Sequence, residues 1–299
     1  MLQFSSRKYV GPRDQAKIQE IINDFIELNT IKMKAFSFSR YLFVVLLASS
    51  MVACGGSDGG SSSEPVQPAR PAKPVTLPLA EIRILVVGQS IASNCNEYSY
   101  GPITNVYQVS KSGAILPASD PFEWADCGKG TVWMPLGKML LDAGIARKVV
   151  FMPIGVGGTK VEDWQSGGLA FNKLNQAIDL VKKQGIAFDL AFWYQGSANA
   201  GDSQAAYRSK LTGVLDYISN RMDIERWLIA VHSRCNGVYD RNVEAAQVDV
   251  GNMLSSRRFP GANNNALGDE YRTDRCHLNH AGQEIMAAAW VESIRSSFK

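Results

Sequence analysis

The chain has 299 residues, of which 45% are hydrophobic and 20% charged, a mixture that excludes a disordered or collagen-like protein. The formal net charge is +3, from 31 Lys and Arg against 28 Asp and Glu. The whole excess lies before Cys54, where seven basic residues stand against four acidic ones, and the other 246 residues carry 24 charges of each sign. The basicity therefore gives no reason to expect a nucleic-acid partner or a polyanionic substrate.

Residues 1–53 have the layout of an export signal. Basic residues at Lys32, Lys34 and Arg40 precede the apolar run 41–48, and small residues then lead to Cys54. The apolar run is shorter than the ~20 residues that cross a bilayer as a helix. Because the ending Val-Ala-Cys resembles the lipobox of bacterial lipoproteins, we expect Cys54 to become lipidated. The alternative is an ordinary signal with an incidental Cys.

This arrangement predicts an exported bacterial lipoprotein in the periplasm, at the outer membrane or on the cell surface, held to the membrane only by its lipid. Met33 opens a signal of ordinary proportions, whereas residues 1–32 make an unusually long leader, so we expect translation to start at Met33. Residues 54–78 are rich in Gly and Ser and then in Pro, which indicates a tether rather than a packed loop.

The remaining residues, 79–299, suit one domain with a substantial core. Four short apolar runs have the character of buried parallel strands: 82–87, 149–154, 190–194 and 227–231. Five segments show helical spacing: 133–143, 170–183, 203–221, 243–255 and 280–297. The alternation predicts an α/β fold, a three-layer α/β/α sandwich around a parallel sheet. In such sheets the chemistry lies at the carboxyl ends of the strands.

Three of the predicted strands are followed by segments that can do chemistry. Ser90 follows the first strand and can present its hydroxyl and its backbone N–H to a cleft. The Gly-rich segment 155–159 follows the second strand and lets backbone N–H groups approach an anion, but it lacks the Gly-Lys-Ser/Thr ending of a P-loop. Asn199 follows the third strand, and its amide can donate to an oxyanion. Each segment taken singly is equally typical of a plain turn.

The chain has only three histidines. Asp274 precedes His277 by three residues, and at that spacing a carboxylate can orient an imidazole. His232 ends the fourth predicted strand and His280 begins the last predicted helix, so we expect structural roles for both.

Taken in order, these segments resemble the SGNH (GDSL-like) hydrolase superfamily. The similarity is closest to its carbohydrate-esterase branch, the sialate O-acetylesterase-like domain, and covers roughly residues 82–295. The motifs that carry it are Gly88-Gln89-Ser90, Gly157-Gly158-Thr159 with Trp164, Trp193-Tyr194-Gln195-Gly196, and Asp274 with His277. Two positions depart from the branch. Ser197 stands where a Glu is usual, and Asn94 follows Ser90 at a distance rather than directly.

The resemblance implies a serine esterase that removes acyl groups, above all O-acetyl groups, from carbohydrates. It makes Ser90 the nucleophile, His277 the general base and acid, and Asp274 its orienting partner. The oxyanion would be bound by the N–H groups of Ser90 and Gly158 and by the side chain of Asn199. No metal or organic cofactor is implied, and we expect a monomer. The alternatives are an esterase of small or lipid esters and a non-catalytic glycan-binding surface protein.

Four cysteines follow Cys54, and an even number in an exported protein favours disulfides: Cys95, Cys127, Cys235 and Cys276. Three pairings are possible. We favour Cys95–Cys127 and Cys235–Cys276, because the second would tie the end of the fourth strand to the His277 loop. No tight Cys/His cluster indicates a metal site instead.

Overall fold

The computed structural model describes residues 76–299. The export signal, the predicted start at Met33, Cys54 and residues 54–75 of the predicted tether lie outside the described residues. Within the described part, none of the helices has the length and apolar character needed to cross a membrane.

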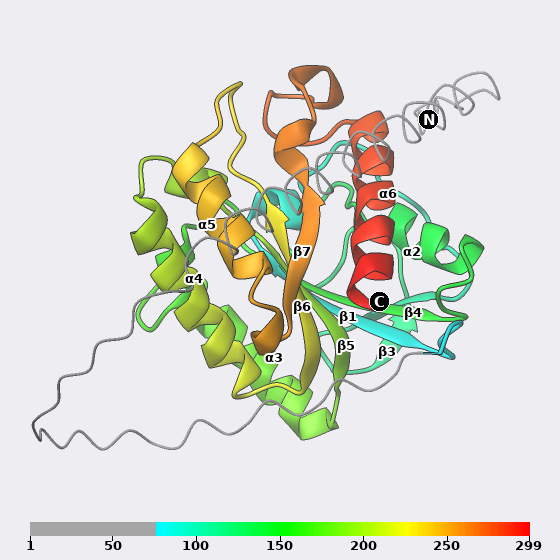
Figure 1. The fold of residues 1–299 in the computed structure, drawn as a ribbon. Coiled ribbons are helices and arrows are strands. Elements are labelled where there is room, and N and C mark those ends of the chain that lie inside the picture. Colours follow the sequence, from blue (N-terminus) through cyan, green and yellow to red (C-terminus); the bar gives the residue numbers. More distant parts are fainter. Residues whose placement is uncertain (1–75) are drawn as a thin grey trace, which may run out of the picture.

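A seven-stranded sheet forms the centre of the fold, in the order β3-β2-β4-β1-β5-β6-β7 (Figure 1). All neighbouring strands are parallel except β3, which is antiparallel to β2. The strands are β1 (Ile82–Gly88), β2 (Val106–Val109), β3 (Ile115–Pro117), β4 (Val149–Gly155), β5 (Phe188–Tyr194), β6 (Ile224–Val231) and β7 (Arg258–Asn263).

The four predicted strands correspond to β1, β4, β5 and β6 and are confirmed. The sequence did not predict β2, β3 or β7, which lie toward the two edges of the sheet. β2 and β3 are only four and three residues long. β7 contains Pro260 and Gly261, residues that are unfavourable inside a strand and tolerated at a sheet edge.

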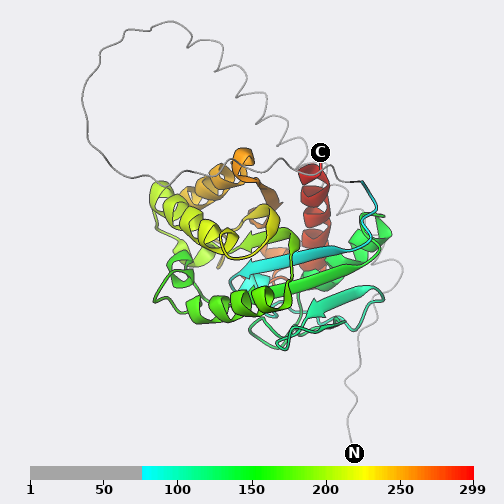
Figure 2. The ribbon, with the colours of Figure 1, turned by 90° about the horizontal axis from the view of Figure 1, so that it is seen from below.

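Helices cover both faces of the sheet (Figures 1 and 2), which confirms the three-layer α/β/α sandwich. One apolar layer contains α2 and α6, and the opposite layer contains α3, α4 and α5. The helices are α2 (Trp133–Asp142), α3 (Phe171–Gln184), α4 (Gln204–Ser219), α5 (Arg241–Gly251) and α6 (His280–Ser297). The fourth predicted helix ends early, since α5 stops at Gly251 and a separate 3-10 turn covers Leu254–Ser256.

The central strand β1 is buried on both faces. Ile84 and Val86 point into the layer of α2 and α6, and Leu85 and Val87 into the other layer. Large aromatic side chains complete the core, for example Trp133, which is fully buried. Trp124 and Trp164 are 5% and 0% exposed, so these three aromatics are core residues and none is a platform for a sugar ring.

The parallel strands β1, β4, β5 and β6 all end at one edge of the sheet, so the loops that follow them meet there. The loops after β6 and β7 project beyond this edge at the top of Figure 1. The backbones approach closely at this point: a Cβ on Gly88 would overlap the carbonyl oxygen of Tyr194 at the end of β5. Only glycine fits there, and it ends β1 directly before the Gln89-Ser90 segment.

Candidate active site

Ser90 opens a short 3-10 turn (Ser90–Ala92) that follows β1, and it lines a cleft of about 410 Å³. As the first residue of the turn it has no acceptor for its N–H within the turn. No other described residue accepts this N–H either. The serine therefore brings both a hydroxyl and a free backbone donor to the cleft.

Gln89 fastens the serine turn to the loop after β5. Its Oε1 accepts the N–H of Gly196 at 3.0 Å, and its Nε2 donates to Oγ of Ser197 at 2.7 Å. Ser197, the residue that departs from the pattern of the carbohydrate-esterase branch, is thus used to hold Gln89. Both residues line the cleft, and the second hydrogen of Nε2 has no acceptor among the described side chains.

Gly158 follows β4 and faces the same cleft. Its φ of +71° lies in the left-handed region that favours glycine, and a Cβ there would meet no atom within 4 Å. Its N–H donates to no residue in the described part of the chain. The Gly158 and Ser90 donors therefore follow two neighbouring strands, whose last residues Gly88 and Gly155 are paired in register.

A side-chain network holds the loop that carries Gly158. Oδ2 of Asp126 accepts the N–H of Gly157 at 3.1 Å, and Nζ of Lys173 binds Oδ1 of the same carboxylate at 2.8 Å. Lys173 also donates to the carbonyl of Gly155 at 2.9 Å. Neither Asp126 nor Lys173 belongs to the motifs that the sequence offered, and only the neighbouring Cys127 pointed to this region.

Asn199 is buried, 1% exposed, and is not among the residues that line the cleft. Its Nδ2 donates to Oε2 of Glu162 at 3.0 Å and to Oδ2 of Asp202 at 3.1 Å. Its Oδ1 accepts the N–H of Val161 at 2.9 Å. Both amide hydrogens are thus occupied, so this arrangement leaves Asn199 no donor for an oxyanion. The difference from the sequence-based expectation comes from two carboxylates, Asp202 three residues further along the chain and Glu162, whose proximity across 37 residues the sequence does not reveal.

Asp274 and His277 are in contact, as their spacing predicts. Oδ2 of Asp274 lies 2.7 Å from Nδ1 of His277, and Oδ1 accepts the backbone N–H groups of Cys276 and His277 at 3.0 and 2.7 Å. Burial would raise the pKa of Asp274, but the hydrogen bonds from His277 and its backbone outweigh it and lower this pKa to about 2. Arg275, with φ of +61°, closes the turn between the two residues.

The other ring nitrogen of His277, Nε2, is buried and has no hydrogen-bond partner among the described residues. It thus makes no hydrogen bond to Ser90 in this conformation, and such bonds are often long in enzymes without substrate. The His277 loop is nevertheless fastened to the segment after Ser90. Leu278 donates to Oδ1 of Asn96 at 3.0 Å and accepts the N–H of Glu97 at 2.9 Å.

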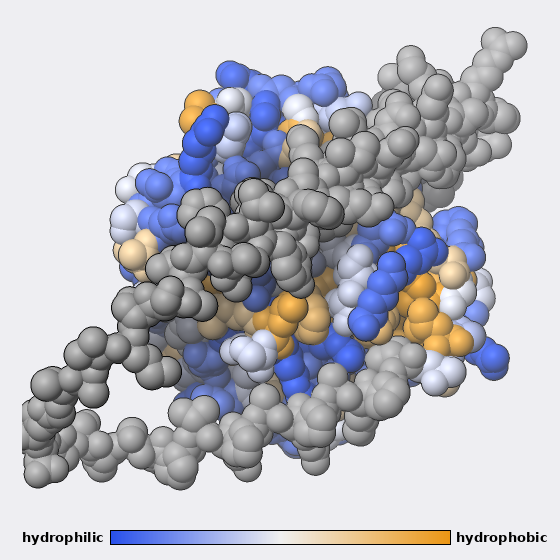
Figure 3. All heavy atoms as spheres, in the orientation of Figure 1, coloured by the Kyte–Doolittle hydropathy of each residue, from blue (hydrophilic) through white to orange (hydrophobic). Residues whose placement is uncertain are grey.

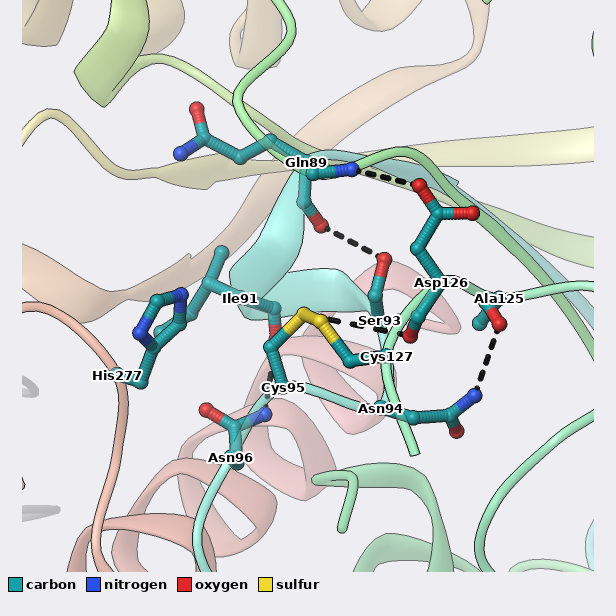
Figure 4. The surroundings of a disulfide bond; sticks show 12 residues. Gln89, Ile91, Ser93, Asn94, Cys95, Asn96, Ala125, Asp126, Cys127 and His277 are labelled. Carbon is teal, nitrogen blue, oxygen red and sulfur yellow. Dashed lines mark hydrogen bonds between the residues drawn. A yellow bond between two sulfur atoms is a disulfide. The ribbon is translucent and has the colours of Figure 1, made fainter. Parts of the chain in front are cut away.

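The two disulfides have the pairing that the sequence favoured. Cys95–Cys127 joins the segment after Ser90 to the residue beside Asp126, and Figure 4 shows His277 in the surroundings of this bond. Cys235–Cys276 joins the loop after β6 to the residue that precedes His277. Each disulfide therefore supports one side of the cleft.

The remaining histidines have structural roles, as expected. His232 is fully buried, and its Nδ1 lies 2.7 Å from Nδ2 of Asn264. His280 is the first residue of α6 and stacks on Tyr98 with ring centroids 4.0 Å apart. Within residues 76–299 no three His, Cys, Asp or Glu side chains are grouped in a way that could hold a metal ion.

The wall of the cleft beyond Cys235 is formed by the loop after β6. This part of the surface is mainly hydrophilic with isolated apolar side chains (Figure 3). Val238 and Tyr239 line the cleft with 70% and 39% of their surfaces exposed. They are apolar surfaces that a bound molecule can cover.

Comparison with known proteins places most of this chain in a family. Residues 91–295 match the family described as "Carbohydrate esterase, sialic acid-specific acetylesterase". The chain belongs to this family. It is accordingly a carbohydrate esterase, a hydrolase, as the sequence motifs indicated.

Solved structures share the fold of this esterase. A protein from Arabidopsis thaliana is 16% identical with a TM-score of 0.54, over 74% of this chain and 100% of that one. NanS is 13% identical with a TM-score of 0.51, over 74% of this chain and 98% of that one. None of the curated proteins compared with it matches this chain.

Proposed function

We propose that this esterase removes O-acetyl groups from carbohydrates through an acyl-Ser90 intermediate. The observation that carries the proposal is the Asp274–His277 pair: Nε2 of His277 is left without a partner, and the preceding residue, Cys276, lines the same cleft as Ser90. A neutral serine needs a base to become a nucleophile, and an imidazole held by a carboxylate is such a base.

The reaction has two steps. In the first, Oγ of Ser90 attacks the ester carbonyl while Nε2 of His277 takes its proton, and Asp274 stabilises the imidazolium. The tetrahedral oxyanion accepts hydrogen bonds from the free N–H groups of Ser90 and Gly158. The sugar oxygen then leaves as a hydroxyl group after taking the proton from His277. In the second step water, activated by His277, hydrolyses the acyl-Ser90 ester and releases acetate.

The carbohydrate part of the proposal rests on the family and on the shape of the cleft. Tyr239 and Val238 offer exposed apolar surface in the cleft that Ser90 also lines, and an aromatic ring can pack on the face of a sugar. Acetate release from acetylated xylan, O-acetylated sialic acid and O-acetylated peptidoglycan identifies the substrate. Hydrolysis of p-nitrophenyl acetate without acetate release from any glycan would instead favour an esterase of small esters.

The nucleophile is tested with Ser90→Ala. The rate of p-nitrophenyl acetate hydrolysis is expected to fall by a factor on the order of 10⁴ or more in this variant, because neither Asp274 nor His277 can replace Ser90 as the residue that forms the acyl intermediate. Ser293→Ala is the control, since its Oγ only donates to Ala289 within α6. Activity of Ser90→Ala equal to that of the control would exclude the mechanism.

Export as a lipoprotein anchored at Cys54 is part of the same proposal. The two disulfides support it, because such bonds persist mainly in oxidising compartments. Labelling cells with a palmitate analogue is expected to mark the wild-type protein and not Cys54→Ser. Equal labelling of both proteins would contradict the anchor.

A further inference from the structure

Arg272 is a buried cation without an acidic partner. It lies between the 3-10 turn Asp269–Tyr271 and Asp274, and only 6% of it is exposed. No carboxylate in the described part of the chain forms an ion pair with it. Burial lowers the pKa of its guanidinium. Burying an unpaired charge is costly, so an apolar residue would fill the same space at lower cost if packing were the only requirement.

The guanidinium joins two backbone segments. Nη1 donates to the carbonyl of Cys276 at 2.5 Å, and Nη2 donates to the carbonyl of Asn264 at 2.8 Å, directly after β7. The Cys276 carbonyl belongs to the peptide bond that leads into His277. Since the Sγ of Cys276 is bound to Cys235, this residue is held by its side chain and by its carbonyl.

Several buried polar atoms in this part of the fold have no hydrogen-bond partner, and two of the side chains that carry them, Tyr194 and His232, interact electrostatically with Arg272. The hydroxyl of Tyr194, Nε2 of His232, Oδ1 of Asn264 and Nε of Arg272 itself are buried without a hydrogen-bond partner, as is Nε2 of His277. Burial lowers the pKa of His232, and the nearby Arg272 and His277 lower it further, so these three side chains lie close enough to interact. Buried polar atoms left over in this way are those that ordered water satisfies.

We propose that Arg272 is a positioning residue for His277: its fork fixes the Cys276 carbonyl against the end of β7 and so sets the direction of the imidazole. The inference rests on the proposed esterase function. A guanidinium suits the task because it offers five N–H donors in a rigid plane, whereas a lysine offers a single point charge. Misplacing a catalytic group by about 1 Å costs about 100-fold in rate.

The test compares Arg272→Gln and Arg272→Lys with the wild-type protein on p-nitrophenyl acetate. We expect kcat to fall about 10- to 100-fold in Arg272→Gln with KM unchanged, because the imidazole is misdirected while the cleft is not altered. Arg272→Lys is expected to recover part of kcat, since it keeps a donor and the charge.

Arg226 provides a matched control. It is also 6% exposed with an unpartnered Nε, but it lies near the start of β6 and packs over the Phe298 ring, 5.2 Å from its centroid. Arg226→Gln is expected to lower Tm and to leave kcat unchanged. If Arg272→Gln lowers Tm to the same extent and also keeps the wild-type kcat, Arg272 does not position His277.

A readout without turnover separates this inference from the function on which it rests. With only three histidines in the chain, the ring signals of His277 can be assigned by NMR. Arg272→Gln is expected to shift them, and Arg226→Gln is not. A wild-type protein without esterase activity would refute the proposed function. Unchanged His277 signals in Arg272→Gln, with an active wild type, would refute the positioning role alone.

Discussion

The two sides of the cleft are built differently. The serine side, with Ser90 and Gly158, follows β1 and β4, two adjacent strands that end in register at Gly88 and Gly155. The histidine side is the loop 272–278, which contains no strand or helix and is pinned at its ends by the isolated bridge between Arg272 and Leu278. The first side inherits its geometry from the sheet, whereas the second is held by cross-links.

This difference shows where the site is vulnerable. Backbone donors at the ends of buried strands keep their direction as long as the sheet is folded. An exposed loop must be ordered against its own conformational entropy, at about 1–2 kcal/mol per residue. Cys276, Asp274 and Arg272 supply that order through a disulfide, two backbone hydrogen bonds and a guanidinium fork. Changes on the histidine side should therefore cost more activity than comparable changes in the support of the serine side.

The largest expected effect among these supports comes from Asp274→Asn. An amide still bonds to His277 but no longer stabilises the imidazolium and favours the wrong tautomer, so kcat should fall on the order of 10⁴-fold. Steady-state kinetics with p-nitrophenyl acetate measures it. Asp269→Asn is the control, because Asp269 binds Arg234 and Arg275 rather than the imidazole. A loss of less than about tenfold in Asp274→Asn would show that the carboxylate does not orient the base.

The same carboxylate predicts a pH dependence of stability. Its folded pKa of about 2 lies below its ordinary value of 3.8, so its contribution to stability is complete above about pH 4 and is lost as the pH falls toward 2. Between about pH 4 and pH 2 the Tm of the wild type should therefore fall more steeply than the Tm of Asp274→Asn. Parallel curves for the two proteins would show that this pKa is not lowered by folding.

The two disulfides give the next largest effect and the most direct comparison of the two sides. They close loops with separations of 32 and 41 residues, so removing either should cost a similar amount, about 2–5 kcal/mol of unfolding free energy. Their kinetic effects should differ. Replacing Cys235 and Cys276 by Ser frees the residue beside His277, so kcat should fall about tenfold. In the double variant of Cys95 and Cys127, kcat should fall by less than half that factor. Equal losses of kcat would break the comparison.

The sequence predicts the serine side more fully than the histidine side. Continuous apolar runs identify the central strands, and parallel packing then places Ser90 and Gly158 at a common edge. The local spacing of Asp274 and His277 predicts their contact. The sequence did not predict a role for Arg272, because its hydrogen-bond acceptors are backbone carbonyls, which no pattern of residue types reveals.

Long-range side-chain pairs were the other source of error. Asn199 was expected to face the substrate, but its amide is taken by Glu162, 37 residues away, and by Asp202. Asp126 finds Lys173 across 47 residues of chain. Sequence motifs identify the residues that follow a strand. They do not identify the distant carboxylate or ammonium groups that bind those residues in the folded protein.

Asp126→Asn is expected to have the smallest effect and tests the serine side at its outer support. The amide can still accept the N–H of Gly157, and only the charge pair with Lys173 is lost. The two side chains are 43% and 23% exposed, and such pairs contribute about 1 kcal/mol or less, so kcat should fall about two- to threefold. Adding salt to the wild type should reproduce part of the loss, because it screens the same pair. A fall in kcat as large as that of Asp274→Asn would mean that the position of the Gly158 N–H depends on side-chain contacts as much as the position of His277 does. The ends of the strands would then not determine the geometry of the serine side.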